Sequence, residues 1–281
     1  MEQIVRNHCL SVLRTRLLTA AVLLPIVAGL IVVGGLPYLA LVAVCAVAAE
    51  AEFVALLDRR GFRPIHLGGI AVVGLCLADG WFPDRDLLAP GLGVILITSL
   101  AWQVLHYPRS RSSEWASAIG SGLYVGIGTW HLIRLRAIPG DGLWWMLIAI
   151  PATLAADSAA YVIGSLWGRR KLAPQLSSGK TWKGYVGAIL VNSALGAGLG
   201  ALWNLYAGPS SEVTWGTGSV IATIIAVLAP LGDLAISMAK READVEDSGR
   251  LLPGHGGMLD RLDTILFAAV IAHTYLLCFV I

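Results

Sequence analysis

The 281-residue chain is 57% hydrophobic and only 14% charged, and its mean hydropathy is +0.74. Soluble domains carry about 25% charged residues, so this composition excludes an ordinary soluble domain and predicts an integral membrane protein. The net charge of +2 gives no indication of nucleic-acid binding.

Apolar runs of spanning length predict about nine transmembrane helices, because a helix needs roughly 20 apolar residues to cross a bilayer. The runs lie near residues 17–35, 37–57, 65–82, 87–106, 115–134, 142–165, 184–206, 217–239 and 262–281. We therefore expect an all-α, polytopic fold with a polar site that faces the cytoplasm. Residues 1–140 are expected to form an N-terminal scaffold with lipid access, and residues 141–281 a C-terminal region that carries the chemistry.

Basic residues predict how these helices are oriented. The N-terminus and the loops after the second, fourth, sixth and eighth helices contain Arg6, Arg14, Arg16, Arg59, Arg60, Arg63, Arg109, Arg111, Arg169, Arg170, Lys171, Lys180, Lys183, Lys240, Arg241, Arg250 and Arg261. The positive-inside rule then places the N-terminus in the cytoplasm and the C-terminus outside, in the inner (plasma) membrane. Arg134 and Arg136, in an outside loop, argue weakly against this orientation.

Two carboxylates, Glu50 and Glu52, lie within the second predicted helix, where an unpaired charge is costly and usually functional. Two interpretations stay open for them. They could form an ion pair near Arg59, or they could line a substrate cavity.

A first polar constellation begins in the sixth predicted helix with Asp157 and, one turn later, Tyr161. A buried carboxylate without a partner is costly in a bilayer, so Asp157 must face a polar interior. Gly164 and Gly168 favour close helix packing, as does the Gly196-x-x-x-Gly200 pattern of the seventh helix.

The loop after the sixth helix contains Gly179-Lys180-Thr181, which is similar to the end of a P-loop. That motif requires a glycine at position 174 and a preceding strand, but the chain has Pro174 there and no strand is predicted. We therefore reject the P-loop and keep Lys180 as a candidate phosphate ligand.

The densest polar stretch, residues 231–263, lies between the last two predicted helices. Helical spacing puts four of its residues on one face: Asp233, Ser237, Lys240 and Asp244. They are followed by Asp247, the turn Pro253-Gly254-His255-Gly256-Gly257, and the pair Asp260 and Asp263. Hard cations prefer several carboxylate oxygens, and phosphoryl oxygens pair with Lys and Arg. The stretch therefore predicts a site for metal ions and phosphates.

Both constellations resemble the phosphatidate cytidylyltransferases (CDP-diacylglycerol synthases), strongly over about residues 150–265. The matching signature is Ser237-x-x-Lys240-Arg241, Asp247 and Pro253-Gly254-His255-Gly256-Gly257-x-x-Asp260-Arg261-x-Asp263, preceded by Asp157-x-x-Ala160-Tyr161 and Lys180-Thr181-x-x-Gly184. Arg16-x-x-Thr19 is a weaker match to the same family. Three positions depart from the pattern, namely Ala239, Lys183 in place of Glu, and Glu246 in place of Lys.

The resemblance implies Mg²⁺-dependent transfer of CMP from CTP to phosphatidate, which gives CDP-diacylglycerol and pyrophosphate. We assign the metal to Asp233, Asp247, Asp260 and Asp263. Phosphate contacts are assigned to Lys240, Arg241, Lys180 and His255, and further substrate contacts to Ser237, Arg261, Asp157 and Tyr161. His255 could instead stabilise its turn, and Asp157 could either bind the metal or support its ligands. A second cation and a homodimer stay open.

Lys183 and Glu246 together preserve the local sum of charges. We therefore predict that they form a salt bridge of reversed polarity between the two loops, with unrelated solvated residues as the alternative. Two other functions remain as alternatives: a CTP-dependent membrane lipid kinase and a transporter. The complete run from His255 to Asp263 favours the cytidylyltransferase, and charges crowded at one face without a visible repeat disfavour the transporter.

Overall fold

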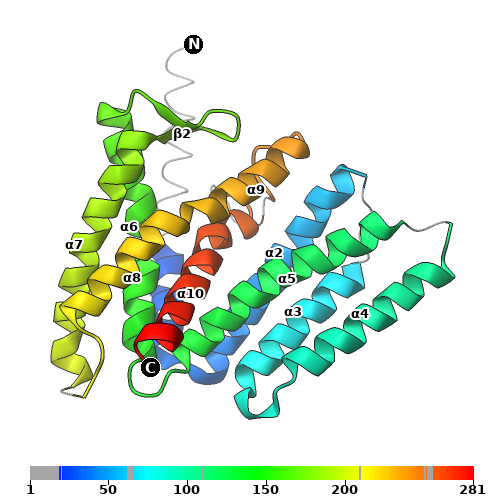
Figure 1. Ribbon diagram of the computed structural model, residues 1–281, viewed down its shortest axis with the longest axis horizontal. Coiled ribbons are helices and arrows are strands. Elements are labelled where there is room, and N and C mark those ends of the chain that lie inside the picture. Colours follow the sequence, from blue (N-terminus) through cyan, green and yellow to red (C-terminus); the bar gives the residue numbers. More distant parts are fainter. Residues whose placement is uncertain are drawn as a thin grey trace.

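The computed structural model describes residues 19, 21–61, 66–108, 111–208, 210–249, 251 and 256–281. A bundle of helices fills most of this part of the chain (Figure 1). Its elements are α2 (Gly35–Arg59), α3 (His66–Trp81), η1 (Pro83–Arg85), α4 (Leu88–Leu105), α5 (Ser112–Arg136), α6 (Gly142–Trp167), β1 (Lys171–Ala173), β2 (Ser177–Thr181), α7 (Trp182–Ala207), α8 (Trp215–Leu228), α9 (Pro230–Glu242) and α10 (Leu259–Phe279). A further short helix spans Ala21–Val33.

Six of the described helices are long and apolar enough to cross a membrane: α2, α4, α6, α7, α10 and the joined α8–α9 segment Trp215–Glu242. The prediction of a multi-pass membrane protein is confirmed, but nine spans are not. The described parts of the first helix, Ala21–Val33, and of α3 are shorter than a span, and α5 is long but not apolar enough. The lower hydropathy of α5 fits its position, since it packs against α2, α3 and α10 (Figure 1).

The expectation of an all-α fold needs one correction, a small hairpin between α6 and α7. Strands β1 and β2 pair antiparallel, with Lys171 opposite Thr181 and Ala173 opposite Ser177. The sequence predicted a loop here, because the two strands are too short and too polar to show an alternating pattern. The Thr181 hydroxyl oxygen accepts a hydrogen bond from the Gly184 backbone N–H at 3.2 Å, which caps α7.

Close glycine contacts position this hairpin, whereas the sequence predicted helix packing for the same glycines. A Cβ on Gly164 of α6, or on Gly168 just after this helix, would collide with the Thr181 hydroxyl. In the same way Gly196 and Gly200 of α7 lie against the backbone of α8. These contacts hold α7 against α8 and hold Thr181 of the hairpin against the end of α6, so the position of the hairpin is fixed.

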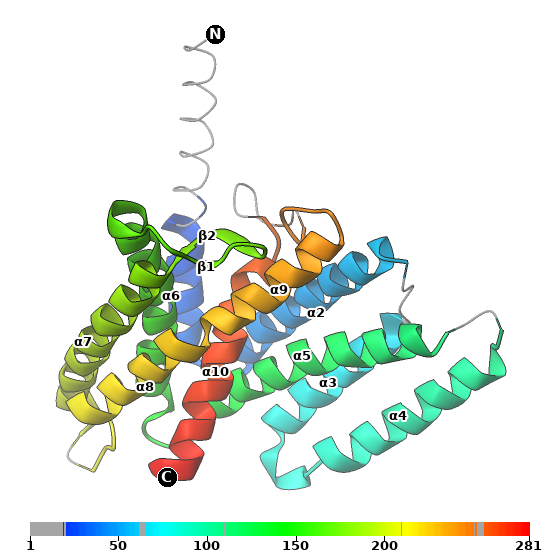
Figure 2. The same ribbon diagram turned by 45° about the horizontal axis from the view of Figure 1, so that its top comes forward.

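The charged segments gather at one end of the bundle. The hairpin, the C-terminal end of α9 and the beginning of α10 lie together, and the C-terminus lies at the opposite end (Figures 1 and 2). An ion pair between Arg60 and Glu242 brings the end of α2 to the same place. This arrangement agrees with the prediction that the basic loops after the second, sixth and eighth predicted helices lie on the same side. The orientation in the membrane stays a prediction, and Arg6, Arg14 and Arg16 lie outside the described residues.

Arg136 lies at the end of the bundle away from the charged segments, and its contacts explain why a cation is found there. Its guanidinium group donates hydrogen bonds to the carbonyls of Ile31, at 2.8 Å, and Val32, at 3.1 Å. These carbonyls end the helix Ala21–Val33 and have no acceptor role within it. Arg136 therefore completes a helix terminus, and its charge is a poor indicator of orientation.

Candidate active site

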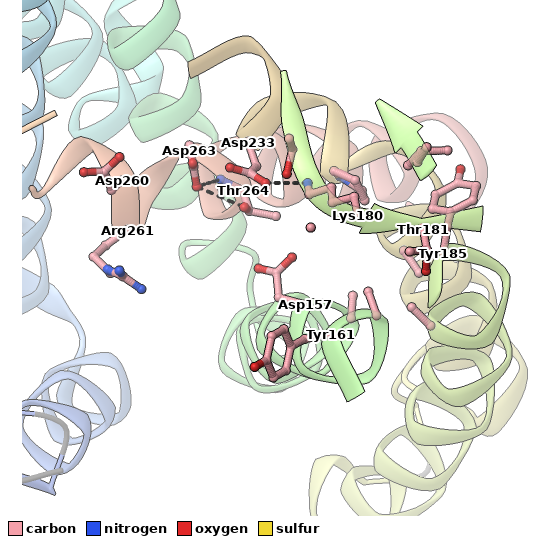
Figure 3. A pocket seen from close by; sticks show the side chains of 18 of the residues that line it. Asp157, Tyr161, Lys180, Thr181, Tyr185, Asp233, Asp260, Arg261, Asp263 and Thr264 are labelled. Atoms are coloured by element: carbon pink, nitrogen blue, oxygen red, sulfur yellow. Dashed lines mark hydrogen bonds and ion pairs between the residues drawn. The ribbon is translucent and has the colours of Figure 1, made fainter. Parts of the chain in front are cut away.

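A cavity of about 400 Å³ lies where α6, the hairpin, α9 and α10 meet (Figure 3). Most of the residues predicted from the sequence line it: Asp157, Tyr161, Lys180, Asp233, Lys240, Asp247, Asp260, Arg261 and Asp263. The two constellations, which are far apart in the sequence, therefore form one site.

The break between α8 and α9 aims Asp233 at the cavity. Pro230 begins α9 and lines the cavity, and Asp233 follows in the first helical turn. A carboxylate is favourable there because the N-terminal end of a helix carries partial positive charge. Ser237 is only 8% exposed, and its hydroxyl lies 3.4 Å from Asp233 Oδ1. The predicted shared face does not extend to Asp244, because α9 ends at Glu242 and Asp244 has a φ of 53°.

Three carboxylates from three helices face one another across the cavity. Asp263, on α10, is 4% exposed, and its Oδ1 accepts hydrogen bonds from the Thr264 backbone N–H at 2.6 Å and the Thr264 hydroxyl at 2.9 Å. Asp233 and Asp157 line the same cavity. Figure 3 shows the Asp157 carboxylate pointing from α6 towards the side that carries the other two. Lys180, from the hairpin, forms an ion pair with Asp233.

Asp260 is held on both of its oxygens. Oδ1 lies 2.6 Å from Lys240 Nζ, and Oδ2 accepts hydrogen bonds from the backbone N–H groups of Ser248, at 2.8 Å, and Gly257, at 3.1 Å. Asp260 thus connects the end of α9 to the loop that precedes α10. Its predicted role as a metal ligand stays a prediction.

Gly256 has a φ of 79°, a backbone conformation that favours glycine, so this glycine of the predicted turn has a structural explanation. The neighbouring Pro253, Gly254 and His255 lie outside the described residues. The predicted role of His255 is therefore not tested.

Not every predicted residue reaches the cavity wall. Arg241 is exposed and is absent from the lining, and Ser237 contributes through Asp233. Lys183 and Glu246 are both exposed, and no ion pair joins them in the part of the chain that the structure describes. The predicted salt bridge between these two residues is wrong. Lys183 lies instead beside Trp167 and Trp182 at a groove between α6 and α7.

Neither interpretation of Glu50 and Glu52 is correct. Within the described residues neither pairs with Arg59, and neither lines the cavity. Glu50 is fully buried and accepts a hydrogen bond from the Ser121 hydroxyl at 2.8 Å. Glu52 contacts the loop before α10, through Ser248 among others. The sequence indicated that Glu52 is functional, because a carboxylate is rare within an apolar helix. Nothing in the sequence indicates a role for Ser248.

The residues fit a metal ion that is shared with a substrate. No three His, Cys, Asp or Glu side chains among the described residues are grouped closely enough to hold an ion by themselves. Mg²⁺ does not need such a cage, because it is usually held by one or two carboxylates together with water and substrate phosphates. Asp233 and Asp263, which face the same cavity, provide such a pair.

The fold and this cavity define a multi-pass membrane protein with a charged site at one end of its helices. Residues 14–279 match the cytidylyltransferase family, and the chain belongs to that family. It is 33% identical to the phosphatidate cytidylyltransferase of Brucella suis over 275 residues, which cover 95% of this chain and 94% of the relative. It is 30% identical to the phosphatidate cytidylyltransferase of Staphylococcus saprophyticus (91% and 95% covered) and 28% identical to that of Mycobacterium tuberculosis (91% and 81% covered).

Proposed function

We propose that this protein is a phosphatidate cytidylyltransferase, which joins CMP from CTP to phosphatidate and releases pyrophosphate. The observation that supports this most strongly is the convergence of carboxylates and cations from α6, the hairpin, α9 and α10 on one cavity. The relatives named above carry the same activity in their names. The reaction brings two polyanions together, so it requires positive charge and alignment more than it requires a nucleophile from the protein.

The residues of the cavity divide this work. The phosphate of phosphatidate attacks the α-phosphorus of CTP, and that phosphate is already ionised near neutral pH, so a general base is not required. Lys240, Arg261 and Lys180 place positive charge around the phosphates. Asp233 and Asp263 would hold Mg²⁺, which when bound neutralises phosphate charge. Asp157 faces this pair across the cavity and would either bind the ion as well or support its ligands.

The position of the cavity explains how a nucleotide and a lipid can meet. Tyr161 lines the cavity and is 77% exposed on α6, a membrane-spanning helix. This exposure supports an open flank of the cavity towards the bilayer, where acyl chains would remain. The loops at the charged end would face cytosolic CTP if the N-terminus is cytoplasmic and the C-terminus is outside the inner membrane.

Labelled CTP distinguishes this function from the lipid kinase alternative. Purified protein is incubated with Mg²⁺, detergent-dispersed lipid and CTP labelled at either the α- or the γ-phosphate. We expect α-label to enter the lipid phase only when phosphatidate is present. Transfer of γ-label to diacylglycerol would show a kinase, and no transfer from either nucleotide would contradict the proposal.

A further inference from the structure

Glu52 makes contacts that the proposed chemistry does not use directly. It lies on α2, in the N-terminal half of the chain, and its carboxylate reaches the loop before α10. Oε1 accepts a hydrogen bond from the Met258 backbone N–H at 3.0 Å, and Oε2 accepts one from the Leu259 backbone N–H at 2.9 Å. The Ser248 hydroxyl lies 2.8 Å from Oε2.

These contacts complete the N-terminus of α10. The first backbone N–H groups of a helix have no partners within it, and α10 has no capping hydrogen bond from its own N-cap side chain. A carboxylate suits this place, because it accepts these hydrogen bonds and its charge is favourable at the positive end of the helix dipole. Glu52 therefore supplies from α2 the cap that α10 lacks.

Two glycines of the loop leave room for this carboxylate. A Cβ on Gly249 would collide with Glu52 Oε1, and one on Gly257 would collide with Glu52 Oε2 and the Ser248 hydroxyl. The glycine at position 257, part of the sequence signature, is thus required by a residue some 200 positions earlier in the chain.

Ser248 extends the contact to the cavity. Its hydroxyl lies 2.9 Å from Asp260 Oδ2 as well as 2.8 Å from Glu52 Oε2, and its backbone N–H donates to the same Asp260 oxygen. The other oxygen of Asp260 is 2.6 Å from Lys240 Nζ, and Lys240 lines the cavity. An unbroken series of contacts therefore runs from Glu52 through Ser248 and Asp260 to Lys240.

We propose that Glu52 is a positioning residue for the reaction: it fixes Ser248 and the start of α10, and through Asp260 it holds Lys240 where a phosphate group binds. This inference rests on the proposed function. A general role in stability can be separated from this one with the Arg60–Glu242 ion pair, which joins the end of α2 to α9. Glu242 therefore offers a control, a carboxylate that also contacts the end of α2 but does not touch the loop before α10.

The test compares Glu52→Gln and Glu52→Asp with Glu242→Gln. Glu52→Gln replaces one carboxylate oxygen, which accepts hydrogen bonds, with an NH₂ group, which cannot accept them. Glu52→Asp shortens the side chain, so its carboxylate no longer reaches the loop. We expect both to lower kcat/KM for CTP by about 10- to 100-fold, mainly through KM, as is typical when support for a site residue is removed. Glu242→Gln should stay within about twofold of wild type. A Glu52→Gln protein with wild-type kinetic constants would overturn the proposal.

A double-mutant cycle tests the path itself. Ser248→Ala removes only a hydroxyl, so it also serves if the Glu52 variants do not fold. Because both residues act through Asp260, we expect Glu52→Gln to cost much less in the Ser248→Ala background than in wild type. Independent losses that multiply, or a fully active Ser248→Ala, would overturn the relay to Lys240.

Hydrogen exchange separates this inference from the proposed function, because it needs no turnover. Wild-type protein that fails to label phosphatidate would refute the proposed function alone. In any case Glu52→Gln should accelerate exchange of the Met258 and Leu259 amides, and Glu242→Gln should not. Unchanged exchange in Glu52→Gln would refute the role of Glu52.

Discussion

Lys180 and Asp233 form an ion pair that joins the β1–β2 hairpin to the first turn of α9. Both residues line the cavity, so a cation suited to phosphate and a carboxylate suited to metal neutralise each other. Binding of Mg²⁺ and a nucleotide would give each of them a partner of opposite charge. Before the substrate and the metal bind, the ion pair therefore keeps Lys180 and Asp233 at the cavity and leaves neither charge unpaired near the membrane.

Lys180→Ala should raise the KM for CTP and lower kcat/KM by roughly tenfold or more, because a charge-assisted hydrogen bond to phosphate is lost. Lys183→Ala is the matched control, since Lys183 lies three residues later but faces a groove between α6 and α7. Steady-state kinetics with CTP as the varied substrate measure both. Equal effects of the two substitutions would mean that Lys180 contributes only general positive charge.

Asp233→Asn and Asp263→Asn should abolish turnover at limiting Mg²⁺ while the protein remains folded. Each substitution keeps the size of the side chain but removes a charge from the proposed metal pair. Asp244→Asn, in an exposed carboxylate just beyond α9, should leave the Mg²⁺ dependence unchanged. A Mg²⁺ titration of activity makes the comparison. Wild-type Mg²⁺ dependence in Asp263→Asn would remove that residue from the metal site.

The sequence predicted the participants of the site better than their partners. The cost of a carboxylate in a membrane helix identified Asp157, and motif spacing identified Lys180 and Asp263, all of which line the cavity. Pairing is a tertiary property, so the Lys180–Asp233 contact was not predictable, and the expected Lys183–Glu246 contact was wrong. Ser248 was missed because an ordinary loop serine gives no sequence signal.

The fold shows the same division. Hydropathy predicted the helices well, but nine spans are not confirmed: among the described residues, six helices are long and apolar enough to cross a membrane, and α5 is insufficiently apolar. The hairpin was missed because its position depends on contacts of Thr181 with Gly164 and Gly168, which a local pattern does not encode.

Gly257→Ala should lower activity strongly and reduce the melting temperature, because its Cβ would collide with the Glu52 carboxylate and the Ser248 hydroxyl. Gly198→Ala is the control, since no atom lies within 4 Å of the place where its Cβ would stand. Alanine there should be neutral or slightly stabilising, by up to about 1 kcal/mol, because it favours the helix. Thermal unfolding and turnover measure both variants. A fully active Gly257→Ala would mean that the loop can move away from Glu52.

Cysteine labelling tests the orientation. The variants carry single cysteines, in a cysteine-free background, at the exposed positions Ser178 in β2, Glu246 after α9 and Ser210 between α7 and α8. The hairpin and the end of α9 lie at the charged end of the bundle, and the connection between α7 and α8 lies at the opposite end (Figure 1). With the N-terminus in the cytoplasm, a membrane-impermeant maleimide should label only Ser210→Cys in intact cells, and only Ser178→Cys and Glu246→Cys in sealed inverted vesicles. Labelling of Ser178→Cys in intact cells would invert the proposed orientation and separate the site from cytosolic CTP.

Charge exchange at Lys183 and Glu246 tests whether the two departures from the family pattern are linked. Both residues are exposed, and they form no ion pair with each other in the described structure. Solvated charges that do not touch interact weakly, by less than about 1 kcal/mol, and salt screens them further. We therefore expect Lys183→Glu and Glu246→Lys each to change kcat/KM only slightly. The double variant should show the product of the two effects within about twofold. Loss of activity in Lys183→Glu that Glu246→Lys restores would instead show that the two loops approach each other during turnover.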